Sequence, residues 1–500
     1  MPYRRKGGIF VSIYLTKMQK CDTIEKSSEN CHPSVGVGFQ VYLTRKGVAE
    51  MCTKYKKTKV LLLCGGGSTR FPGCKKRKPF CPKGITAAQD PTLAKYAFGK
   101  LGPTFLQDEI RLFLESGFDP SDIYMIVTDE EQLAEAKKQV EIFGVPHSNI
   151  LLQNQYFGYV AIMGIGGHDI QELFAEDIKL FISPSDAHMQ NPEGFCQAIE
   201  MAYNESERTG ASIMLCAKVS DENTITGCGN FLYDRTEKGD SYTMSKFIEK
   251  PSLDKARELQ RNGNSMVSTG IYLVSAKTLV ENYPYDELQQ RLDAFLMDDC
   301  PDTDLRLSVK EFVEKMKFRA VLMKAGWTDA GTLPDYYGIL PKGANHHNAW
   351  VGSDIERYEC FDSLFTALEE GQCMRAANIR NSAAMMYTQD GRLCIGVMPL
   401  ACGQLAGIMT KIFRGTPLSE REQRAYEILD GTKMGCRIAP TNLSDKITVV
   451  FLGSKGITVT AHRDAATDKL YAYIGAEDGE NCCIDEATIV AAMTALRTDS

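Results

Sequence analysis

Long apolar runs are missing from this sequence of 500 residues. No stretch reaches the 18 or more consecutive apolar residues that indicate a membrane-spanning helix. An excess of positive charge is missing as well, because 57 Lys and Arg stand against 64 Asp and Glu, a net charge of −7. Without a basic field, nucleic-acid binding by counterion release is excluded as the main activity. We therefore expect a cytoplasmic protein with neither a nucleic-acid nor a membrane partner.

Metal and disulfide spacings are also missing. The 17 cysteines are an odd number with no C-x-x-C pair, and Cys482 and Cys483 are adjacent, which is awkward geometry for a mutual bond. The seven histidines show no zinc-ligand spacing. We expect reduced thiols and no zinc site.

The first 58 residues form an expected N-terminal extension. A basic segment at 4–6 precedes an apolar run at 9–15, which resembles a poor signal peptide. The run is short and no small-residue cleavage site follows it. We favour a short strand or an extended segment there.

The remaining chain shows an α/β pattern. From residue 59 to about 325, short apolar segments alternate with longer amphipathic ones, which predicts βαβ units on a mostly parallel sheet. Asp129 and Gln132 form a capping-box-like helix start, and Gly144 ends the apolar helical pattern that follows. The strands are expected at 59–64, 122–127, 149–152, 179–183 and 211–219.

The pattern changes after Gly227. Strands are expected at 230–234, 242–248 and 266–275, with a helix at 253–261, and a Gly- and Asn-rich stretch at 342–348 marks a boundary. We expect a Rossmann-like (GT-A-like) domain over 59–340, a β-rich segment over 341–400 and an α+β tail over 401–500. In the tail, strands at 447–452 and 469–474 are expected with helices at 420–429 and 484–497.

A glycine-rich loop follows the first expected strand. It reads Gly65, Gly66, Gly67, Ser68, Thr69 and Arg70, and a basic run follows at 75–78. Consecutive glycines let backbone N–H groups approach an anion without Cβ clashes, and ligands of α/β sheets bind at the carboxyl ends of strands. The G-x-G-x-x-G pattern fails because it needs a glycine at Arg70, and the P-loop pattern is absent. The loop therefore predicts a phosphate site and not a dinucleotide dehydrogenase.

Residues 63–70 followed by Lys78 and Pro79 resemble the signature of sugar-1-phosphate nucleotidyltransferases, L-A-G-G-x-G-T-R and then K-P or P-K. Ser68 stands where the family has its last glycine. The resemblance implies phosphate contacts from the loop, from Arg70 and from either Lys78 or Lys83. Both lysines stay open, because the spacing after Arg70 is longer than usual.

Further blocks of this family occur downstream in the family's order. Gln153, Gln155 and Gly158 lie in a segment that resembles the base-contacting block. Asp186 lies in a segment similar to the P-A-D-H block of the guanylyltransferases, and Asp329 in one similar to W-x-D-x-G-[ST]. The resemblance implies that these two carboxylates hold Mg²⁺, an ion that proteins often bind through one or two carboxylates plus substrate phosphates.

The sugar side of the resemblance rests on two blocks. Glu249 and Lys250 match F-x-E-K-P, and Thr269 lies in a segment similar to [NST]-[ST]-G-[ILM]-[FY]. The resemblance implies that Lys250 holds the sugar phosphate and that Glu249, with Thr269 nearby, accepts sugar hydroxyls.

A weaker similarity over 348–364 favours the mannose-1-phosphate guanylyltransferase branch. The resemblance implies transfer of a nucleotidyl group from GTP to mannose 1-phosphate with Mg²⁺, and it allows a homo-oligomer. Two alternatives stay open. One is a catalytically weak nucleotide-sugar binding or regulatory paralogue, and the other is a glucose-1-phosphate nucleotidyltransferase with another base.

Overall fold

The computed structural model describes residues 55, 57–65, 76–153, 158–234, 236, 239–288, 290, 307–344, 347–443, 446–476 and 485–497. The chain divides into two units, Met1–Gly47 and Val48–Ser500. The first unit, and with it most of the expected N-terminal extension, lies outside the described residues. All of the following concerns the second unit.

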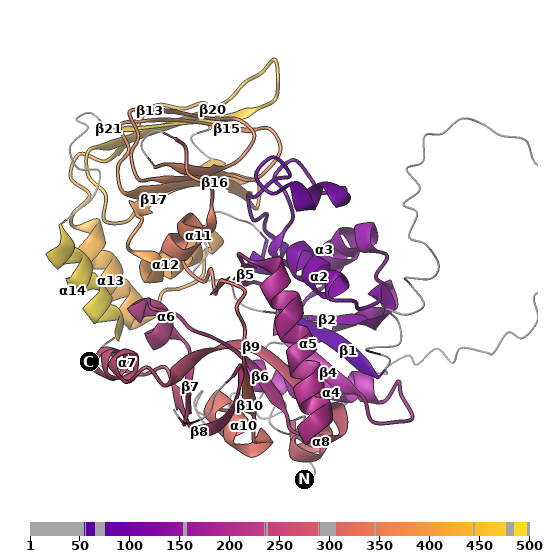
Figure 1. Ribbon diagram of the computed structural model, residues 1–500. Coiled ribbons are helices and arrows are strands. Elements are labelled where there is room, and N and C mark those ends of the chain that lie inside the picture. The colour runs from indigo at the N-terminus through magenta and orange to yellow at the C-terminus, as the bar shows by residue number, and fades with distance from the viewer. Residues whose placement is uncertain are drawn as a thin grey trace, which may run out of the picture. The chain divides into compact units, whose positions relative to one another are not determined.

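A nine-stranded sheet forms the first half of this unit, in the order β3-β2-β1-β4-β9-β6-β10-β8-β7 (Figure 1). Strands β3, β2, β1 and β4 are parallel, whereas β9 runs antiparallel to both β4 and β6. The α/β prediction is therefore confirmed, and the antiparallel pairs come from β7, β8 and β9. The bounds are β1 Thr58–Leu63, β2 Ile123–Val127, β3 Ile150–Leu152, β4 Lys179–Pro184, β6 Ile213–Ala217, β7 Gly229–Tyr233, β8 Ser241–Glu249, β9 Ser265–Ser275 and β10 Arg319–Leu322.

Helices cover both faces of this sheet, because its central strands are apolar on both sides. On β1, Val60 and Leu62 pack with α2, α3 and α5, whereas Leu61 packs with α4, α8 and α10. Helices α6 and α7 lie beside β7 and β9. The bounds are α2 Phe105–Glu115, α3 Glu130–Val140, α4 Tyr159–Gln171, α5 Pro192–Thr209, α6 Glu222–Gly227, α7 Leu253–Asn262, α8 Ala276–Asn282 and α10 Val309–Met316.

The helix start predicted at Asp129 is confirmed. The Asp129 side chain accepts a hydrogen bond of 2.7 Å from the backbone N–H of Gln132, which satisfies one of the unpaired donors at the start of α3. The pattern also ends as expected, since Gly144 adopts a left-handed conformation with φ of 73° after a short 3-10 turn.

Two five-stranded sheets form the second half, in the orders β12-β14-β16-β17-β19 and β13-β15-β21-β20-β18. Apolar side chains such as Phe365, Met386 and Val459 fill the space between them. The bounds are β12 Ala349–Val351, β13 Ile355–Tyr358, β14 Leu364–Ala367, β15 Gln372–Ala377, β16 Ser382–Gln389, β17 Arg392–Pro399, β18 Arg437–Ile438, β19 Ile447–Phe451, β20 Ile457–Arg463 and β21 Leu470–Ala476.

The boundary expected at residue 400 runs through both sheets. Strand β19 pairs with β17, and β21 pairs with β15, so strands from either side of residue 400 are neighbours. Helices α11 Leu333–Ile339, α12 Ala406–Arg414, α13 Glu420–Asp430 and α14 Glu486–Arg497 add residues to a core on the β12-to-β19 sheet. The capping box at Ser419 and Glu422 starts α13 as predicted.

This second core reaches back to the segment that precedes α2. Cys81 and Phe105 belong to the same buried cluster as Leu333, Leu364 and Met398. The hydroxyl of Tyr336 also donates a hydrogen bond of 3.0 Å to the carbonyl of Pro82. The C-terminal strands and α11 therefore brace the segment that carries Lys78 and Lys83.

The cysteine prediction needs one correction. Nine described cysteines, among them Cys64, Cys216 and Cys394, are thiols, but Cys81 is disulfide-bonded. Because the other described cysteines carry no disulfide, the second half of that bond lies outside the described residues.

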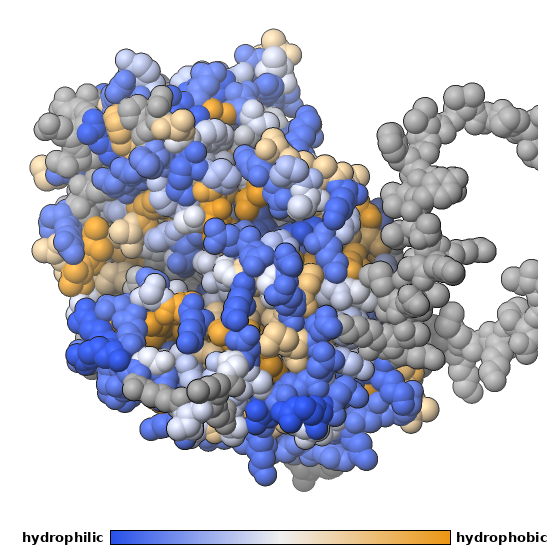
Figure 2. Space-filling view, in the orientation of Figure 1, coloured by the Kyte–Doolittle hydropathy of each residue, from blue (hydrophilic) through white to orange (hydrophobic). Residues whose placement is uncertain are grey.

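The surface of the described chain is mainly polar. Figure 2 shows hydrophilic residues over most of the visible face, with hydrophobic residues confined to patches. Within the described part, no helix has both the length and the apolar character that crossing a bilayer requires.

Candidate active site

The carboxyl ends of three parallel strands meet at one edge of the nine-stranded sheet. Leu63 of β1 stands opposite Pro184 of β4, and the next residue, Cys64, donates its backbone N–H to Ile126 of β2 at 3.0 Å. The hydroxyl of Ser185 then bridges back to the Leu63 carbonyl at 2.8 Å. Asp186 therefore emerges beside the start of the glycine-rich loop.

Gly65 is required by a close approach at this edge. A Cβ built at Gly65 would lie 2.3 Å from Cγ2 of Thr128, the residue that follows β2. Carbon atoms in proteins do not approach so closely without displacing one another. The first residue of the loop thus has no room for a side chain unless Thr128 moves.

Lys78, which follows the glycine-rich loop in the sequence, also lies at this edge. Its Nζ lies 3.2 Å from Oδ2 of Asp186 and donates a hydrogen bond of 2.7 Å to the main-chain carbonyl of Asp329. The Lys78 side chain is 3% exposed and that of Asp186 is 35% exposed. Three residues assigned to catalysis from the sequence therefore meet at one buried ammonium group.

A two-stranded ribbon brings the two aspartates together. Strand β5, His188–Met189, begins two residues after Asp186, and β11, Trp327–Thr328, directly precedes Asp329. The two strands pair antiparallel, with Thr328 opposite His188. Antiparallel pairing sets the segment before β5, which contains Asp186, beside the segment after β11, which begins with Asp329, although the two are far apart in sequence.

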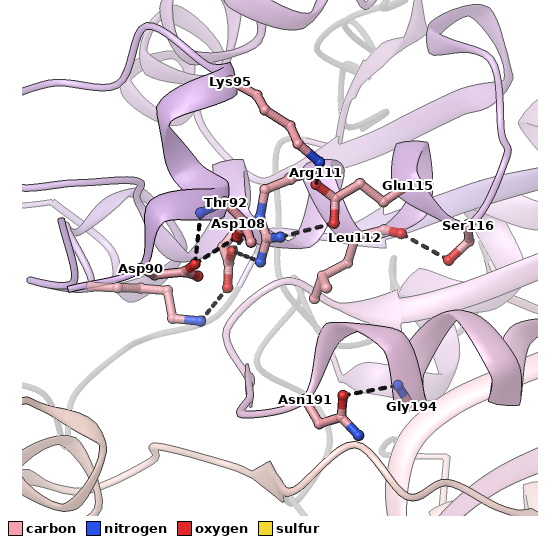
Figure 3. Close-up of polar contacts among 11 residues, drawn as sticks. Asp90, Thr92, Lys95, Asp108, Arg111, Leu112, Glu115, Ser116, Asn191 and Gly194 are labelled. Carbon is pink, nitrogen blue, oxygen red and sulfur yellow. Dashed lines mark hydrogen bonds and ion pairs between the residues drawn. The ribbon is translucent and has the colours of Figure 1, made fainter. Parts of the chain in front are cut away.

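Lys83 lies in a buried ion-pair network and not at the Asp186 edge. Its Nζ pairs with the carboxylate of Asp108 on α2, and Arg111 reaches the same carboxylate at 2.6 Å. Figure 3 shows the Arg111 guanidinium between the carboxylates of Asp108 and Glu115. Burial alone would raise the pKa of Asp108, but the charges of Lys83 and Arg111 lower it to about 2. Lys83 therefore forms a buried ion pair with Asp108 that stabilises the fold.

Phe105 lies against both lysines. Its ring centroid is 5.2 Å from Nζ of Lys78 and 5.5 Å from Nζ of Lys83, and the ring is fully buried. An aromatic face attracts a cation at this distance. Phe105 therefore helps to hold the Lys78 ammonium in place at the edge.

Two buried titratable residues near this site were missed from the sequence. Burial raises the pKa of Glu109 to about 8, while its Oε1 accepts a hydrogen bond of 2.7 Å from the Ser183 hydroxyl. Burial, followed by the Lys83 charge, lowers the pKa of His188 to about 3. The sequence could have indicated that Glu109 is buried, because it lies at helical spacing from the apolar residues Phe105, Leu106 and Phe113.

Glu249 and Lys250 lie at the end of β8. Oε2 of Glu249 is buried with no hydrogen-bond partner among the described residues, and burial raises the pKa of this carboxyl. A Cβ on Gly229, the residue opposite in register, would lie 2.8 Å from that oxygen. Lys250 is exposed and adopts a φ of 42°, which is uncommon for a residue other than glycine.

Thr269 lies beneath the surface of the sheet. It is 3% exposed, and its hydroxyl donates a hydrogen bond of 2.8 Å to the Leu215 carbonyl inside β6. The Thr269 hydroxyl therefore donates its hydrogen bond to a neighbouring strand of the sheet.

The expected base-contacting block is described only in part. Gly158 caps α4 with a φ of 116°, a conformation that favours glycine. The backbone N–H of Gln153 donates to the Val127 carbonyl at 2.8 Å, which extends the pairing of β3 with β2. The other predicted nucleotide contacts lie outside the described residues, namely Gly66, Gly67, Ser68, Thr69, Arg70 and Gln155.

The donor set suits a magnesium ion more than a transition metal. No group of three or more His, Cys, Asp or Glu residues gathers around a common point in the described part of the chain. Mg²⁺ prefers oxygen donors and commonly uses one or two carboxylates, with water and phosphate oxygens completing its shell. Asp186 is partly exposed and adjacent to the Asp329 main chain, so the residues present fit such an ion.

Comparison with known proteins adds a family and several relatives. A family model described as nucleotidyl transferase matches residues 92–345, half of the chain. The match includes Asp186, Glu249, Lys250 and Asp329 and begins after the glycine-rich loop and Lys78.

Curated relatives match with low identity. The alginate biosynthesis protein AlgA of Pseudomonas aeruginosa is 24% identical over 306 residues, covering 57% of this chain and 59% of that protein. Mannose-1-phosphate guanylyltransferase RfbM of Salmonella typhimurium is 23% identical over 228 residues, covering 42% of this chain and 46% of that protein. The chain thus spans about half the length of the curated relatives it matches.

A solved structure shares the fold. The structure described as mannose-1-phosphate geranyltransferase from Thermus thermophilus matches with a TM-score of 0.54 at 18% identity. The match covers 72% of this chain and 99% of that one, so it extends beyond the nine-stranded sheet into the C-terminal strands.

Proposed function

The chain belongs to the nucleotidyl transferase family, and on that premise we propose that it transfers a guanylyl group from GTP to mannose 1-phosphate and releases pyrophosphate. The observation that carries the reaction is the meeting of Lys78, Asp186 and Asp329 at the carboxyl edge of β1 and β4. The choice of GTP and mannose rests on relatives such as the Salmonella enzyme.

Charge is the first requirement of this reaction. A nucleoside triphosphate and a sugar 1-phosphate together carry about six negative charges at neutral pH. Lys78 supplies a buried and fixed cation, and electrostatic stabilisation by such preorganised groups is strong. Arg70, in the same loop segment, would supply another.

The transfer itself needs positioning more than acid–base chemistry. A phosphate oxygen of the sugar 1-phosphate attacks the α-phosphorus of the triphosphate in line, a new P–O bond forms, and the bond to the β-phosphate breaks. Pyrophosphate leaves with the electron pair of that bond. No covalent intermediate with the protein is needed, and Lys78 stabilises the charge that develops on the phosphoryl oxygens.

Asp186 and Asp329 would hold Mg²⁺, which when bound neutralises phosphate charge and orients the triphosphate. Lys78 restrains the Asp186 carboxylate through its ion pair at 3.2 Å. The hydrogen bond from Lys78 to the Asp329 carbonyl fixes the second aspartate segment to the same point.

Glu249 is the residue best suited to accept sugar hydroxyls. A buried carboxylate oxygen without a partner is costly, and hydroxyl donors from a ligand would remove that cost. The neighbouring Lys250 is exposed, so its ammonium can meet the sugar phosphate.

The test is pyrophosphate release by the full chain with four NTPs, each paired with mannose 1-phosphate and with glucose 1-phosphate, with and without Mg²⁺. We expect Mg²⁺-dependent release with GTP and mannose 1-phosphate. Asp186→Asn should reduce it about 10²–10³-fold, whereas Asp254→Asn, at an exposed position on α7, should leave it unchanged. Pyrophosphate release with another pair of substrates would support the nucleotidyl transfer but assign a different base or sugar. If the folded chain releases no pyrophosphate with any pair but still binds GDP-mannose, it is a binding paralogue.

A further inference from the structure

One strand of the nine-stranded sheet is irregular beside the proposed active site. Along β9, Ser268 stands opposite Cys216 of β6. Tyr272, four residues further along β9, stands opposite Met214, which is only two residues from Cys216. The extra residues of β9 form a β-bulge around Gly270, whose φ is 78°. Bulges are frequent next to active sites, where they redirect the chain or end the pairing.

One end of this bulge lies level with the sugar side of the proposed site. Gly229 of β7 stands opposite Glu249 of β8. The residue after it, Asn230, stands opposite Val267 of β9. Because β7 and β9 run antiparallel, the next residue of β9, Ser268, lies in the row of Gly229 and Glu249.

The other end of the bulge meets the strand that leads to the proposed metal carboxylate. Tyr272 stands opposite Ile182 of β4, and β4 ends two residues before Asp186. A Cβ built on Gly270 would lie 2.9 Å from Cγ of Pro184, the last residue of β4. The bulge therefore packs directly on the end of β4, with no room for a side chain between them.

Gly270 is also the point at which β9 comes to the surface. It is partly exposed, whereas every other residue of β9 from Met266 to Val274 is buried. The side chain of its neighbour Thr269 turns inward and donates its hydroxyl to the Leu215 carbonyl. The part of the bulge that a substrate can reach is therefore the main chain of Gly270.

Tyr159, the first residue of α4, holds this main chain. Its hydroxyl donates a hydrogen bond of 2.8 Å to the Gly270 carbonyl, across 111 residues of sequence. The same hydroxyl oxygen would lie 3.3 Å from a Cβ on Gly270, so the phenol also packs closely on the bulge. Tyr159 directly follows Gly158, the last residue of the expected base-contacting block. The hydrogen bond thus ties the start of α4 to the sugar side of the site.

We propose that Tyr159 is a positioning residue for the sugar 1-phosphate, because it holds the Gly270 main chain as one wall of the sugar site. The inference rests on the proposed transfer reaction and adds a residue to its sugar side. Without the Tyr159 hydroxyl, the Gly270 carbonyl loses a donor, and the bulge can shift relative to Glu249. Sugar binding should weaken, whereas the contact between Lys78 and Asp186 does not involve Tyr159.

The test is the kinetics of pyrophosphate release by Tyr159→Phe, with GTP and mannose 1-phosphate or with whichever pair the wild type accepts. We expect KM for the sugar 1-phosphate to rise about tenfold, the effect of one lost hydrogen bond. The value of kcat and the KM for the NTP should stay within about twofold of the wild type, because only sugar binding is affected.

Tyr233→Phe is the matched control. It likewise removes a phenol hydroxyl that donates to a glycine carbonyl, that of Gly263 at 3.4 Å. Tyr233 lies at the end of β7 opposite to the end that pairs with Glu249. Both KM values should therefore stay unchanged in this variant, even if its stability falls slightly.

Hydrogen exchange of the substrate-free chain tests the hold on the bulge itself. Exchange over residues 268–272 should be faster in Tyr159→Phe than in the wild type, and unchanged in Tyr233→Phe. Equal exchange in Tyr159→Phe and the wild type overturns the proposal. So does a KM for the NTP that rises as much as the KM for the sugar 1-phosphate.

Failure of the transferase proposal gives a different result. The wild type then releases no pyrophosphate with any pair, and calorimetric titration with GDP-mannose replaces KM as the measurement. Binding that is about tenfold weaker in Tyr159→Phe than in the wild type would support the positioning role in a binding protein. Equal binding by the two chains, or no binding by the wild type, overturns it.

Discussion

The Nζ of Lys78 lies 3.2 Å from Oδ2 of Asp186, although 108 residues separate the two along the chain. The cation is buried and the carboxylate is partly open, at 3% and 35% exposure of the side chains. This asymmetry favours a charge that stays fixed while the carboxylate faces incoming substrate. Phe105 and the Asp329 carbonyl hold the same ammonium from two further sides.

Lys78→Met should reduce kcat/KM for pyrophosphate release by about 10²–10³, since one fixed charge at the transition state is worth roughly 3–4 kcal/mol. Initial rates over a range of GTP concentrations measure this effect. The matched control is Lys76→Met, which removes a lysine that is 42% exposed and pairs with Glu135 on α3. We expect its rate to stay within about twofold of the wild type, because exposed pairs contribute little. Equal losses in both variants would contradict the role assigned to Lys78.

Lys83→Met should act on stability. Its removal leaves Asp108 buried with only part of its compensating charge, which typically costs about 3–5 kcal/mol of the free energy of unfolding. Urea denaturation followed by circular dichroism gives the change in midpoint. Lys95→Met, which removes an exposed lysine 3.9 Å from Glu115, should change the free energy of unfolding by less than about 0.5 kcal/mol. If the Lys83→Met chain is as stable as the wild type but inactive, Lys83 acts in catalysis and not in stability.

The sequence predicted the fold where local signals suffice. The strands of the nine-stranded sheet are short apolar runs, and Asp129 and Ser419 mark helix starts through residues only three positions away. The family resemblance assigned Asp186, Asp329 and either Lys78 or Lys83 to one site, and the structure brings Lys78, Asp186 and the Asp329 main chain together.

Long-range partners could not be predicted in the same way. The choice between Lys78 and Lys83 depends on Asp108, which lies on α2 and becomes a partner of Lys83 only after α2 packs against the preceding segment. The C-terminal sheets likewise pair β15 with β21 across almost one hundred residues, and no local pattern carries such a register. The expected division at residue 400 was set where the family resemblance ends, whereas the strand pairing runs across it.

Glu109 should make stability fall as the pH rises. Burial raises its pKa from 4.5 to about 8, so the folded chain keeps the proton while the unfolded chain releases it. The stabilisation is full below about pH 4.5 and is lost as the pH rises through about 8, with a slope of up to about 1.4 kcal/mol per pH unit. Glu109→Gln removes the charge and keeps an acceptor for the Ser183 hydroxyl. Chemical denaturation from pH 5 to 9 should show the variant growing more stable than the wild type with pH, and parallel curves would contradict this account.

Gly65→Ala tests how tightly the start of the loop is built. The new Cβ would meet Cγ2 of Thr128 at 2.3 Å, and rotating Thr128 away would break the hydrogen bond of 3.0 Å that its Oγ1 accepts from Gln132. We expect a loss of about 1–3 kcal/mol in the free energy of unfolding, typical of overpacking, together with slower pyrophosphate release. Thr128→Ser removes Cγ2 and keeps the hydroxyl for Gln132, so this change alone should cost little. Added to Gly65→Ala, it should restore most of both losses, and a double-mutant cycle measures the coupling. Additive effects in that cycle would show that the glycine is needed for a reason other than its contact with Thr128, because removing the clashing methyl group would then have relieved nothing.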